Sequence, residues 1–312
     1  MHIVSNEVGI DVCKDWLDVS LEGARTFRAS NTLAGIDQLE GRIPSGSVIH
    51  MESSGGYERL AHRELRSRGH LVRVHNPRKV RRLADVRGLS AKTDDLDARH
   101  LSTCGKVLPV RPDKSSQRES LCDISRAIQT LKADSSAYKK RIQTPELEPA
   151  VVGVYKELVK ALELEIRELE KTFVQRVKGS SLKTKYAHAL SVPGIGPVAA
   201  RVLVSELHEE LSGIGSRQVC SYAGLAPMDE ASGKTIRASR LRKGNSHLKA
   251  AMYMPALTAI AKHQWAKDLY AGLRAKGRNH EQAIVPVMRR MLVRVVVVLK
   301  RGSPWQVEPP RG

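Results

Sequence analysis

The chain has 312 residues, with 52 Lys and Arg against 33 Asp and Glu, which gives a formal net charge of +19. A hydrophobic content of 41% allows packed cores and excludes a disordered or fibrous chain, while the longest late apolar run, residues 291–299, contains Arg294 and is too short to cross a bilayer. The N-terminus has no signal-peptide pattern, so we expect a cytoplasmic, nucleoid-associated protein whose charge favours nucleic acid over a membrane.

The first hundred residues predict an α/β domain. Residues 8–14, 16–22 and 25–30 follow one another as short strands, which is typical of an antiparallel meander. Asn31 can cap a helix carrying Leu33, Ile36 and Leu39, and the pattern continues with a strand at 47–52, a helix at 56–68, a strand at 71–76 and a basic helix opened by Pro77. This order favours a ribonuclease H-like arrangement over a plain doubly wound sheet.

The middle of the chain is predicted to be helical. Apolar residues recur at helical spacing from about residue 117 to residue 177, and the segment 144–149 (TPELEP) interrupts them. Two long helices are expected, packed as a hairpin or as an intermolecular coiled coil, with a simple helical spacer as the alternative. Beyond about residue 187 we expect a mostly helical domain with glycine-rich turns. The expected domains are therefore 1–112, 113–185 and 186–312.

Basic residues concentrate in several segments. Residues 231–267 contain eight Lys and Arg and no Asp or Glu, which indicates a phosphate-facing surface or a solvated face. The turn around Gly194 and Gly196 is similar to that of helix-hairpin-helix modules, whose exposed amides can cradle a phosphate, although a tight turn alone could require these glycines. The residues expected to contact nucleic acid are Arg78, Arg81, Arg82, Lys92, Gly194, Gly196, Lys234, Arg237, Arg240, Arg242 and Lys243.

Aromatic residues make up only 4% of the chain, which argues against single-strand binding on stacked aromatic side chains. Recognition of duplex backbone and shape by Arg and Lys is favoured instead.

Four acidic residues stand out. Asp11 lies within an apolar strand and Glu52 at the end of another, while Asp94 and Asp97 would share one face of a helix that starts near residue 93. Carboxylates from different elements are what a pair of divalent metal ions needs for phosphoryl transfer. The alternative for Asp94 and Asp97 is a favourable interaction with the helix dipole, and His100, one turn on, is expected at the surface.

Several stretches, taken in order, resemble a known family. They are GIDVCKDWLDVSL from Gly9, ESSGGYERL from Glu52, HNPRKVRRLA from His75, AKTDDLDARHL from Ala91, VPGIGPVAA from Val192, YAGLAPMDEASGKTIRASRLRKGNSHLKAAMY from Tyr222 and VVVVLKRGSPW from Val295. Their order and spacing resemble the IS110-type transposases, also called DEDD recombinases, which include the pilin-gene invertases.

The resemblance implies a RuvC-like domain whose metal-binding tetrad is Asp11, Glu52, Asp94 and Asp97, with Mg²⁺ or Mn²⁺ as cofactor. It also implies that Ser232 is a nucleophile that joins covalently to DNA. Target and donor duplexes would be paired by a structured noncoding RNA, the bridge RNA. Homodimers would assemble into tetramers, with active sites shared between protomers. From the residues alone, SGK at 232–234 is an ordinary turn, and nearby cations could stabilise charge at an activated serine.

Three functions stay open at this point. The leading one is a metal-dependent DNA recombinase that forms a phosphoserine. The first alternative is a RuvC-like endonuclease in which water attacks the phosphate, and the second is a non-catalytic nucleic-acid-binding protein on the same scaffold.

Overall fold

A computed structural model describes residues 6–21, 26–88, 94–109, 115–207, 211, 213–228, 231–232, 235–236, 240–241 and 244–306, and omits the side chains of 94–96, 104, 228, 231–232, 235–236 and 240. The chain divides into two compact units, Met1–Asp113 and Lys114–Gly312. Each unit has a large hydrophobic core of its own. None of the helices in the described ranges is long and apolar enough to span a membrane.

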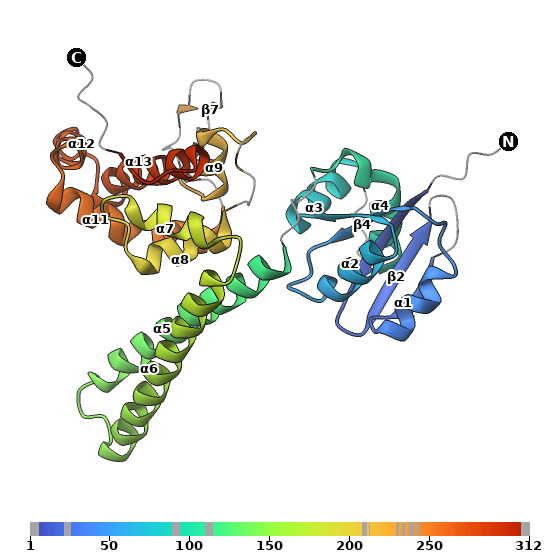
Figure 1. Ribbon diagram of the computed structural model, residues 1–312, viewed down its shortest axis with the longest axis horizontal. Helices are drawn as coiled ribbons and strands as arrows, with labels where there is room; N and C mark the ends of the chain where they lie inside the picture. The colour runs from blue at the N-terminus through green and yellow to red at the C-terminus, as the bar shows by residue number, and fades with distance from the viewer. Residues whose placement is uncertain are drawn as a thin grey trace. The chain divides into compact units, whose positions relative to one another are not determined.

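The first unit is built on a mixed five-stranded sheet (Figure 1). The strand order is β3-β2-β1-β4-β5, with β1–β2 and β2–β3 antiparallel and β1–β4 and β4–β5 parallel. The predicted meander and the ribonuclease H-like order are confirmed. The elements are β1 (Glu7–Val12), β2 (Trp16–Leu21), β3 (Phe27–Ser30), α1 (Leu33–Glu40), β4 (Val48–Glu52), α2 (Glu58–Ser67), β5 (Leu71–His75), α3 (Pro77–Val86), α4 (Asp94–Cys104) and a 3-10 turn, Gly105–Val107.

The two faces of this sheet differ in chemistry, because successive side chains of a strand point to opposite faces. One face is apolar: Ile10 of β1 and Met51 of β4 are fully buried with Ile36 of α1 and Leu65 of α2. The other face carries polar and small residues, among them Gly9, Asp11, Asp18, Ser20, His50, Glu52, Arg73 and His75. Helices α1 and α2 therefore cover the apolar face and leave the polar face for α4.

Helix α4 packs directly on the polar face at Gly9. A Cβ at that position would lie 2.0 Å from the carbonyl oxygen of Ala98 and 2.4 Å from the amide nitrogen of Ser102. Farther along, a Cβ at Gly105 would lie 2.1 Å from the ring of His50. Both approaches are possible only because these residues lack a side chain, so the two glycines fix α4 and the turn after it against the sheet.

The second unit is mostly helical. Its helices are α5 (Ser116–Ile142), α6 (Pro149–Lys178), α7 (Lys183–Ser191), α8 (Pro197–Glu206), α9 (Ser216–Tyr222), α10 (Ser246–Ala251), α11 (Tyr253–Lys262), α12 (Gln264–Ala275) and α13 (His280–Arg301). Its core is centred on α8 and α13, where Val202, Leu203, Val287 and Leu292 are buried, and the aliphatic run near the C-terminus is core helix. This run, residues 291–299, is the one that the sequence predicts to be too short to cross a bilayer.

Helices α5 and α6 form a long antiparallel hairpin, as the interrupted apolar stripe predicts (Figure 1). Lys132 of α5 pairs with Glu170 of α6 at 2.7 Å, and nearer the tip the rings of Tyr138 and Tyr155 are 5.3 Å apart. Pro149 opens α6 at its first turn, where a missing amide hydrogen costs nothing.

Short strands interrupt this mostly helical unit around residue 232, where the sequence predicts only a turn. The described residues there include four two-residue strands, β6 (Pro227–Met228), β7 (Ala231–Ser232), β8 (Thr235–Ile236) and β9 (Arg240–Leu241). Strand β6 pairs with β9 and β7 with β8, both antiparallel, so the strands form a nested β-ribbon. Two-residue strands are too short to produce an alternating pattern in the sequence.

Candidate active site

Asp11 and Glu52 lie on adjacent parallel strands of the first unit. The last paired positions of β1 and β4 are Ile10 and Met51, and the two acids follow them directly. Because neighbouring strands are about 4.8 Å apart and both residues belong to the polar face, their carboxylates are neighbours at the carboxyl ends of the strands. Both are half-buried, and the Asp11 Oδ1 accepts a 3.0 Å hydrogen bond from the Val12 amide.

Helix α4, which packs on the same face, carries the two other acids of the expected tetrad in its sequence. Asp97 is half-buried and directly precedes Ala98, which touches Gly9, while Asp94 is the first residue of the helix and its side chain lies outside the described residues. The three elements that carry these acids, β1, β4 and α4, therefore pack against one another at one face of the sheet.

The expectation for His100 is wrong. His100 is 4% exposed, and burial lowers its pKa below the usual value. A hydrogen bond to the backbone of Val80 raises the pKa, but by less. Its position on the inner side of α4 makes it a packing residue between α3 and α4.

Asn31 connects the loops that follow the two acid-bearing strands. Its side-chain amide donates 3.0 Å hydrogen bonds to the carbonyl of Cys13, after β1, and to the carbonyl of Tyr57, after β4. Asn31 was expected to cap α1, but Thr32 does so, with its hydroxyl accepting from the Gly35 amide at 3.2 Å. The asparagine instead fixes the spacing of the strand ends at which Asp11 and Glu52 lie.

Glu58 organises the segment immediately after Glu52. Its carboxylate accepts hydrogen bonds from the Ser53 hydroxyl, the amide and hydroxyl of Ser54 and the Gly56 amide, at 2.8 to 3.3 Å. Burial raises the pKa of Glu58, but these hydrogen bonds lower it by more, so the pKa lies below its ordinary value. A charged, 8% exposed carboxylate thus holds the turn in which Gly55 and Gly56 adopt positive φ.

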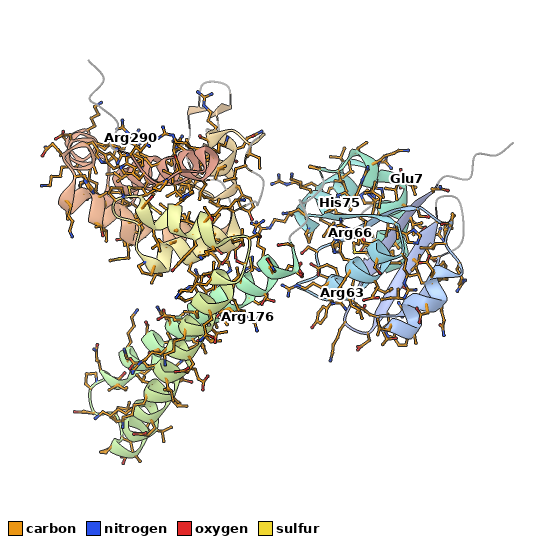
Figure 2. The ribbon with its side chains drawn as sticks, in the orientation of Figure 1. Glu7, Arg63, Arg66, His75, Arg176 and Arg290 are labelled. Carbon is orange, nitrogen blue, oxygen red and sulfur yellow. The ribbon has the colours of Figure 1, made fainter. Side chains whose placement is uncertain are left out.

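A chain of titratable side chains crosses the buried part of the polar face, and two of its members, Glu7 and His75, are labelled in Figure 2. Glu7 Oε2 is 2.5 Å from His50 Nε2, His50 Nδ1 is 2.9 Å from His75 Nε2, and His75 Nδ1 is 3.4 Å from the Pro109 carbonyl oxygen. Since a carbonyl only accepts, His75 donates from Nδ1 and accepts from His50 at Nε2. Burial lowers the pKa of both histidines, that of His75 to about 4, so His75 is neutral at pH 7.

Ser232 belongs to the second unit, where its backbone lies in β7 and pairs with Thr235. The base of the ribbon is tightly closed: a Cβ at Gly244 would lie 2.3 Å from the Gly224 amide nitrogen, and the Asn245 amide donates to the Tyr222 carbonyl at 2.7 Å. The ribbon is therefore clamped at the point where it leaves the helical body.

A buried polar network joins this clamp to the helical hairpin. Arg126 of α5 makes a two-pronged ion pair with Glu206 of α8, at 2.6 and 2.9 Å, and the Glu206 Oε2 accepts from the Asn245 side chain at 2.8 Å. Glu206 is 1% exposed, so its charge depends on these partners. The Glu206 carboxylate raises the pKa of Arg126 and keeps it charged.

The residues expected to contact nucleic acid lie on separate elements. Arg78, Arg81 and Arg82 are exposed along α3, where Arg81 lies 3.8 Å from Asp85. Gly194 has a φ of +90° in the turn between α7 and α8, and Gly196 precedes α8 with open space around its Cα. The backbone of Arg240 lies in β9, and the others, Lys92, Lys234, Arg237, Arg242 and Lys243, lie outside the described residues.

The carboxylates on the polar face fit a divalent metal by their donor chemistry. They supply only oxygen atoms, from β1, β4 and α4, which is the ligand type that Mg²⁺ and Mn²⁺ prefer. Within the described side chains, from which Asp94 is omitted, no group of three or more Asp, Glu, His or Cys gathers closely enough to hold an ion.

The sheet order and its acid-bearing face define the first unit as ribonuclease H-like, followed by a mostly helical unit. Comparison with known proteins gives the family. The DEDD transposase domain of the IS110 type matches residues 8–145, and the transposase IS116/IS110/IS902 family domain matches residues 186–271. The chain belongs to this family of transposases, enzymes that cut and rejoin DNA strands.

Individual relatives agree with this assignment. The pilin gene-inverting proteins of Moraxella bovis and Moraxella lacunata are each 24% identical over 314 residues, 96% of this chain and 97% of their own length. A 43.6 kDa protein of insertion element IS110 from Streptomyces coelicolor is 31% identical over 123 residues, which is 39% of this chain and 30% of that protein.

Several supporting residues escaped sequence reasoning. Gly9 had a visible signal, since a glycine two residues before an acid in an apolar strand indicates close approach of another backbone. Glu58 had a weaker signal, a carboxylate two residues after the Ser-Ser-Gly-Gly segment. Asn31 and the Glu7, His50 and His75 chain depend on contacts between distant segments, which no local pattern reveals.

Proposed function

We propose that this transposase cuts and rejoins DNA through a phosphoserine at Ser232, with Asp11, Glu52, Asp94 and Asp97 as the metal-binding tetrad. The observation that carries the proposal is the convergence of acids on one face: Asp11 and Glu52 at adjacent strand ends, with α4 and its acids packed on the same face through Gly9.

The four carboxylates would hold Mg²⁺ or Mn²⁺, which when bound neutralises charge on the scissile phosphate and its neighbouring oxygens. The serine does the covalent chemistry. A bond forms between Ser232 Oγ and phosphorus while the bond from phosphorus to the adjoining sugar oxygen breaks, and the hydroxyl proton passes to that oxygen. In rejoining, a sugar hydroxyl of the new strand attacks the phosphoserine and releases the serine. Lys234, Arg237 and Arg240, close in sequence, supply positive charge.

The rest of the molecule positions nucleic acid in this proposal. Helix α3 presents Arg78 and Arg82 to solvent, and the one acid in its sequence is Asp85. The helix therefore suits contact with a phosphate backbone. The open space at Gly196, at the start of α8, suits close approach of a phosphate, as in helix-hairpin-helix modules. Gly194, with its φ of +90°, forms the turn that leads to Gly196, and a Cβ there would lie 3.1 Å from Met291 Cε.

Partners and organisation follow the family resemblance. We place the domains at 1–112, 113–185 and 186–312, with α5 and α6 as the coiled-coil region. A bridge RNA pairs with target and donor DNA, homodimers assemble into tetramers, and the first unit of one protomer works with Ser232 of another. The protein acts in the cytoplasm, at the nucleoid.

A covalent trap tests the proposal. The protein is incubated with its flanking noncoding RNA, matching duplexes and Mg²⁺, then denatured, and DNA-linked protein is detected on a gel. We expect a covalent band for the wild type and for Ser246→Ala, an exposed serine outside the ribbon, and none for Ser232→Ala or Asp11→Asn. Cleavage that survives Ser232→Ala without any covalent band would instead support a nuclease that uses water.

A further inference from the structure

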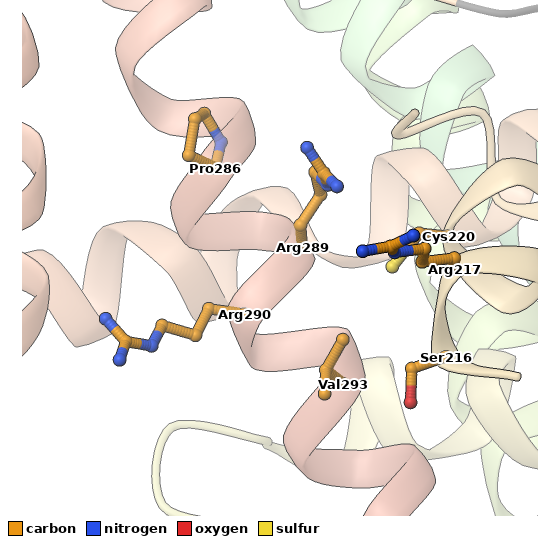
Figure 3. Close-up of a pocket in the computed structure, with 7 residues that line it drawn as sticks. All are labelled: Ser216, Arg217, Cys220, Pro286, Arg289, Arg290 and Val293. Carbon is orange, nitrogen blue, oxygen red and sulfur yellow. The ribbon is translucent and has the colours of Figure 1, made fainter. Parts of the chain in front are cut away.

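A pocket in the second unit is lined by arginines from two elements that are far apart in the sequence (Figure 3). It lies between α9 and α13 and has a volume of about 270 Å³. Arg217 and Ser216 come from α9, and Arg289 and Arg290 from α13. At about 30 Å³ for each water of the liquid, the pocket has room for a phosphodiester group with part of its hydration.

The positive charge of this pocket is not balanced within the described part of the chain. The lining contains no carboxylate, and no ion pair joins Arg217, Arg289 or Arg290 to any acid that the structure describes. Cys220, on the same wall, cannot supply a counter-charge, since burial raises the pKa of its thiol above the ordinary value despite the opposing effect of Arg289. Like charges held together at a pocket favour a bound anion.

Aromatic contacts hold the neighbouring arginines without neutralising them. The Arg290 guanidinium lies 5.4 Å from the centre of the Trp265 ring, and that of Arg294 lies 4.0 Å from the same ring. In Figure 3 the Arg217 side chain reaches from α9 toward α13, while Arg290 projects to the far side of α13. Arg217 and Arg289 are therefore the cations at the centre of the pocket, and Arg290 lies at its edge.

We infer that this pocket binds a backbone phosphate of the DNA substrate, with Arg217 and Arg289 as its principal ligands and the Ser216 hydroxyl as a further donor. The guanidinium fork suits phosphate oxygens, and three arginines without an acid exclude a cationic ligand. The inference rests on the transposase function, but not on the phosphoserine mechanism, because it concerns DNA binding and not strand cleavage.

Salt-dependent binding tests the pocket. Binding of a fluorescent 30-base-pair duplex to the full-length protein is measured by anisotropy between about 50 and 200 mM salt. The double variant Arg217→Gln/Arg289→Gln is compared with Lys140→Gln/Lys156→Gln, which removes the same charge from exposed positions on α5 and α6. We expect the first pair to lower the affinity about tenfold or more and to reduce the slope of log K against log salt by about one to two. We expect a smaller change in the second.

Equal losses in the two double variants, an unchanged salt slope in Arg217→Gln/Arg289→Gln, or a loss confined to a duplex RNA probe would each overturn the inference. Competition by inorganic phosphate that depends on the two arginines, without any effect on DNA, would identify a free-phosphate site instead and would also contradict it.

Two controls keep the outcome interpretable. Arg217→Lys/Arg289→Lys retains the charge and should keep the salt slope while losing part of the affinity, since lysine lacks the two-pronged donor geometry. Repeating the measurement in a Ser232→Ala background separates the pocket from the chemistry. In that background, Arg217→Gln/Arg289→Gln should reduce the salt slope by the same amount as in the wild type, even if the covalent trap shows no phosphoserine.

Discussion

At the scale of single residues, the acids of the candidate site depend on side chains that take no part in the chemistry. Glu58 holds the turn after Glu52 with four hydrogen bonds, and Asn31 joins that turn to the one after β1. The positions of Asp11 and Glu52 are thus set from both ends: by strand pairing before them and by these contacts after them.

Glu58→Gln should weaken this support. The neutral amide keeps one acceptor oxygen but leaves some of the four donors without a partner, at a cost of about 1–3 kcal/mol in the free energy of unfolding. We expect reduced strand cleavage together with a lower urea midpoint at pH 7. Glu64→Gln, on the same helix, removes a carboxylate that pairs with the exposed Arg63 next to it and should leave both unchanged. Equal effects of the two substitutions would contradict the role given to Glu58.

His75 makes the first unit sensitive to mild acid. Its pKa is about 4 in the folded state against 6.5 for an ordinary histidine, so the unfolded chain binds a proton first as the pH falls. The contribution of the neutral His75 to the free energy of unfolding is therefore fully present above about pH 6.5. It is lost progressively down to about pH 4, and about 2 kcal/mol of it is lost at pH 5. Urea unfolding at pH 7.5 and 5.0 should show a smaller difference in His75→Gln than in the wild type; an equal difference would exclude His75 as the cause.

At the scale of elements, α4 is held at a fixed distance from the sheet by Gly9. Gly9→Ala should push α4 outward, because the added methyl would overlap the Ala98 carbonyl oxygen at 2.0 Å. We expect a loss of about 1–3 kcal/mol in unfolding free energy and a marked loss of cleavage. Gly41→Ala is the matched control, since that glycine has a φ of −68° and the nearest atom to the new Cβ, the Gln38 carbonyl oxygen, would be 3.8 Å away. A Gly9→Ala variant as active as the control would show that the position of α4 is not critical.

The elements also show where sequence reasoning succeeds. Strands β1, β2 and β4 and helices α5 and α6 were predictable because each is long enough to show its period of two or of 3.6 residues. Strands β6 to β9 were not, because a two-residue strand has no period. Asp11 and Glu52 were singled out by their misfit in apolar strands, and Asp94 and Asp97 by their spacing on a helix. The roles of Asn31 and Glu58 arise from pairing between segments and needed the fold.

At the scale of the whole molecule, the two units have separate cores and need not unfold together. Trp16 reports on the first unit, where it is 46% exposed, and Trp265 and Trp305 pack against the core of the second. Chemical unfolding of Trp265→Phe/Trp305→Phe and of Trp16→Phe should therefore give different midpoints, and Gly9→Ala should move only the one reported by Trp16. Coincident midpoints that shift together in Gly9→Ala would indicate a single cooperative unit.

The α5–α6 hairpin has a consequence for local dynamics. Its apolar residues near the body, such as Ile128 and Phe173, are buried in the core, whereas Val154 and Leu164 are 59% and 56% exposed. Backbone amides are released to solvent by partial opening, and openings are easiest where few neighbours must be broken. Deuterium uptake should therefore rise steadily along both helices toward residues 143–148, and any protein or nucleic acid that covers the hairpin would be detected as a flattening of that gradient.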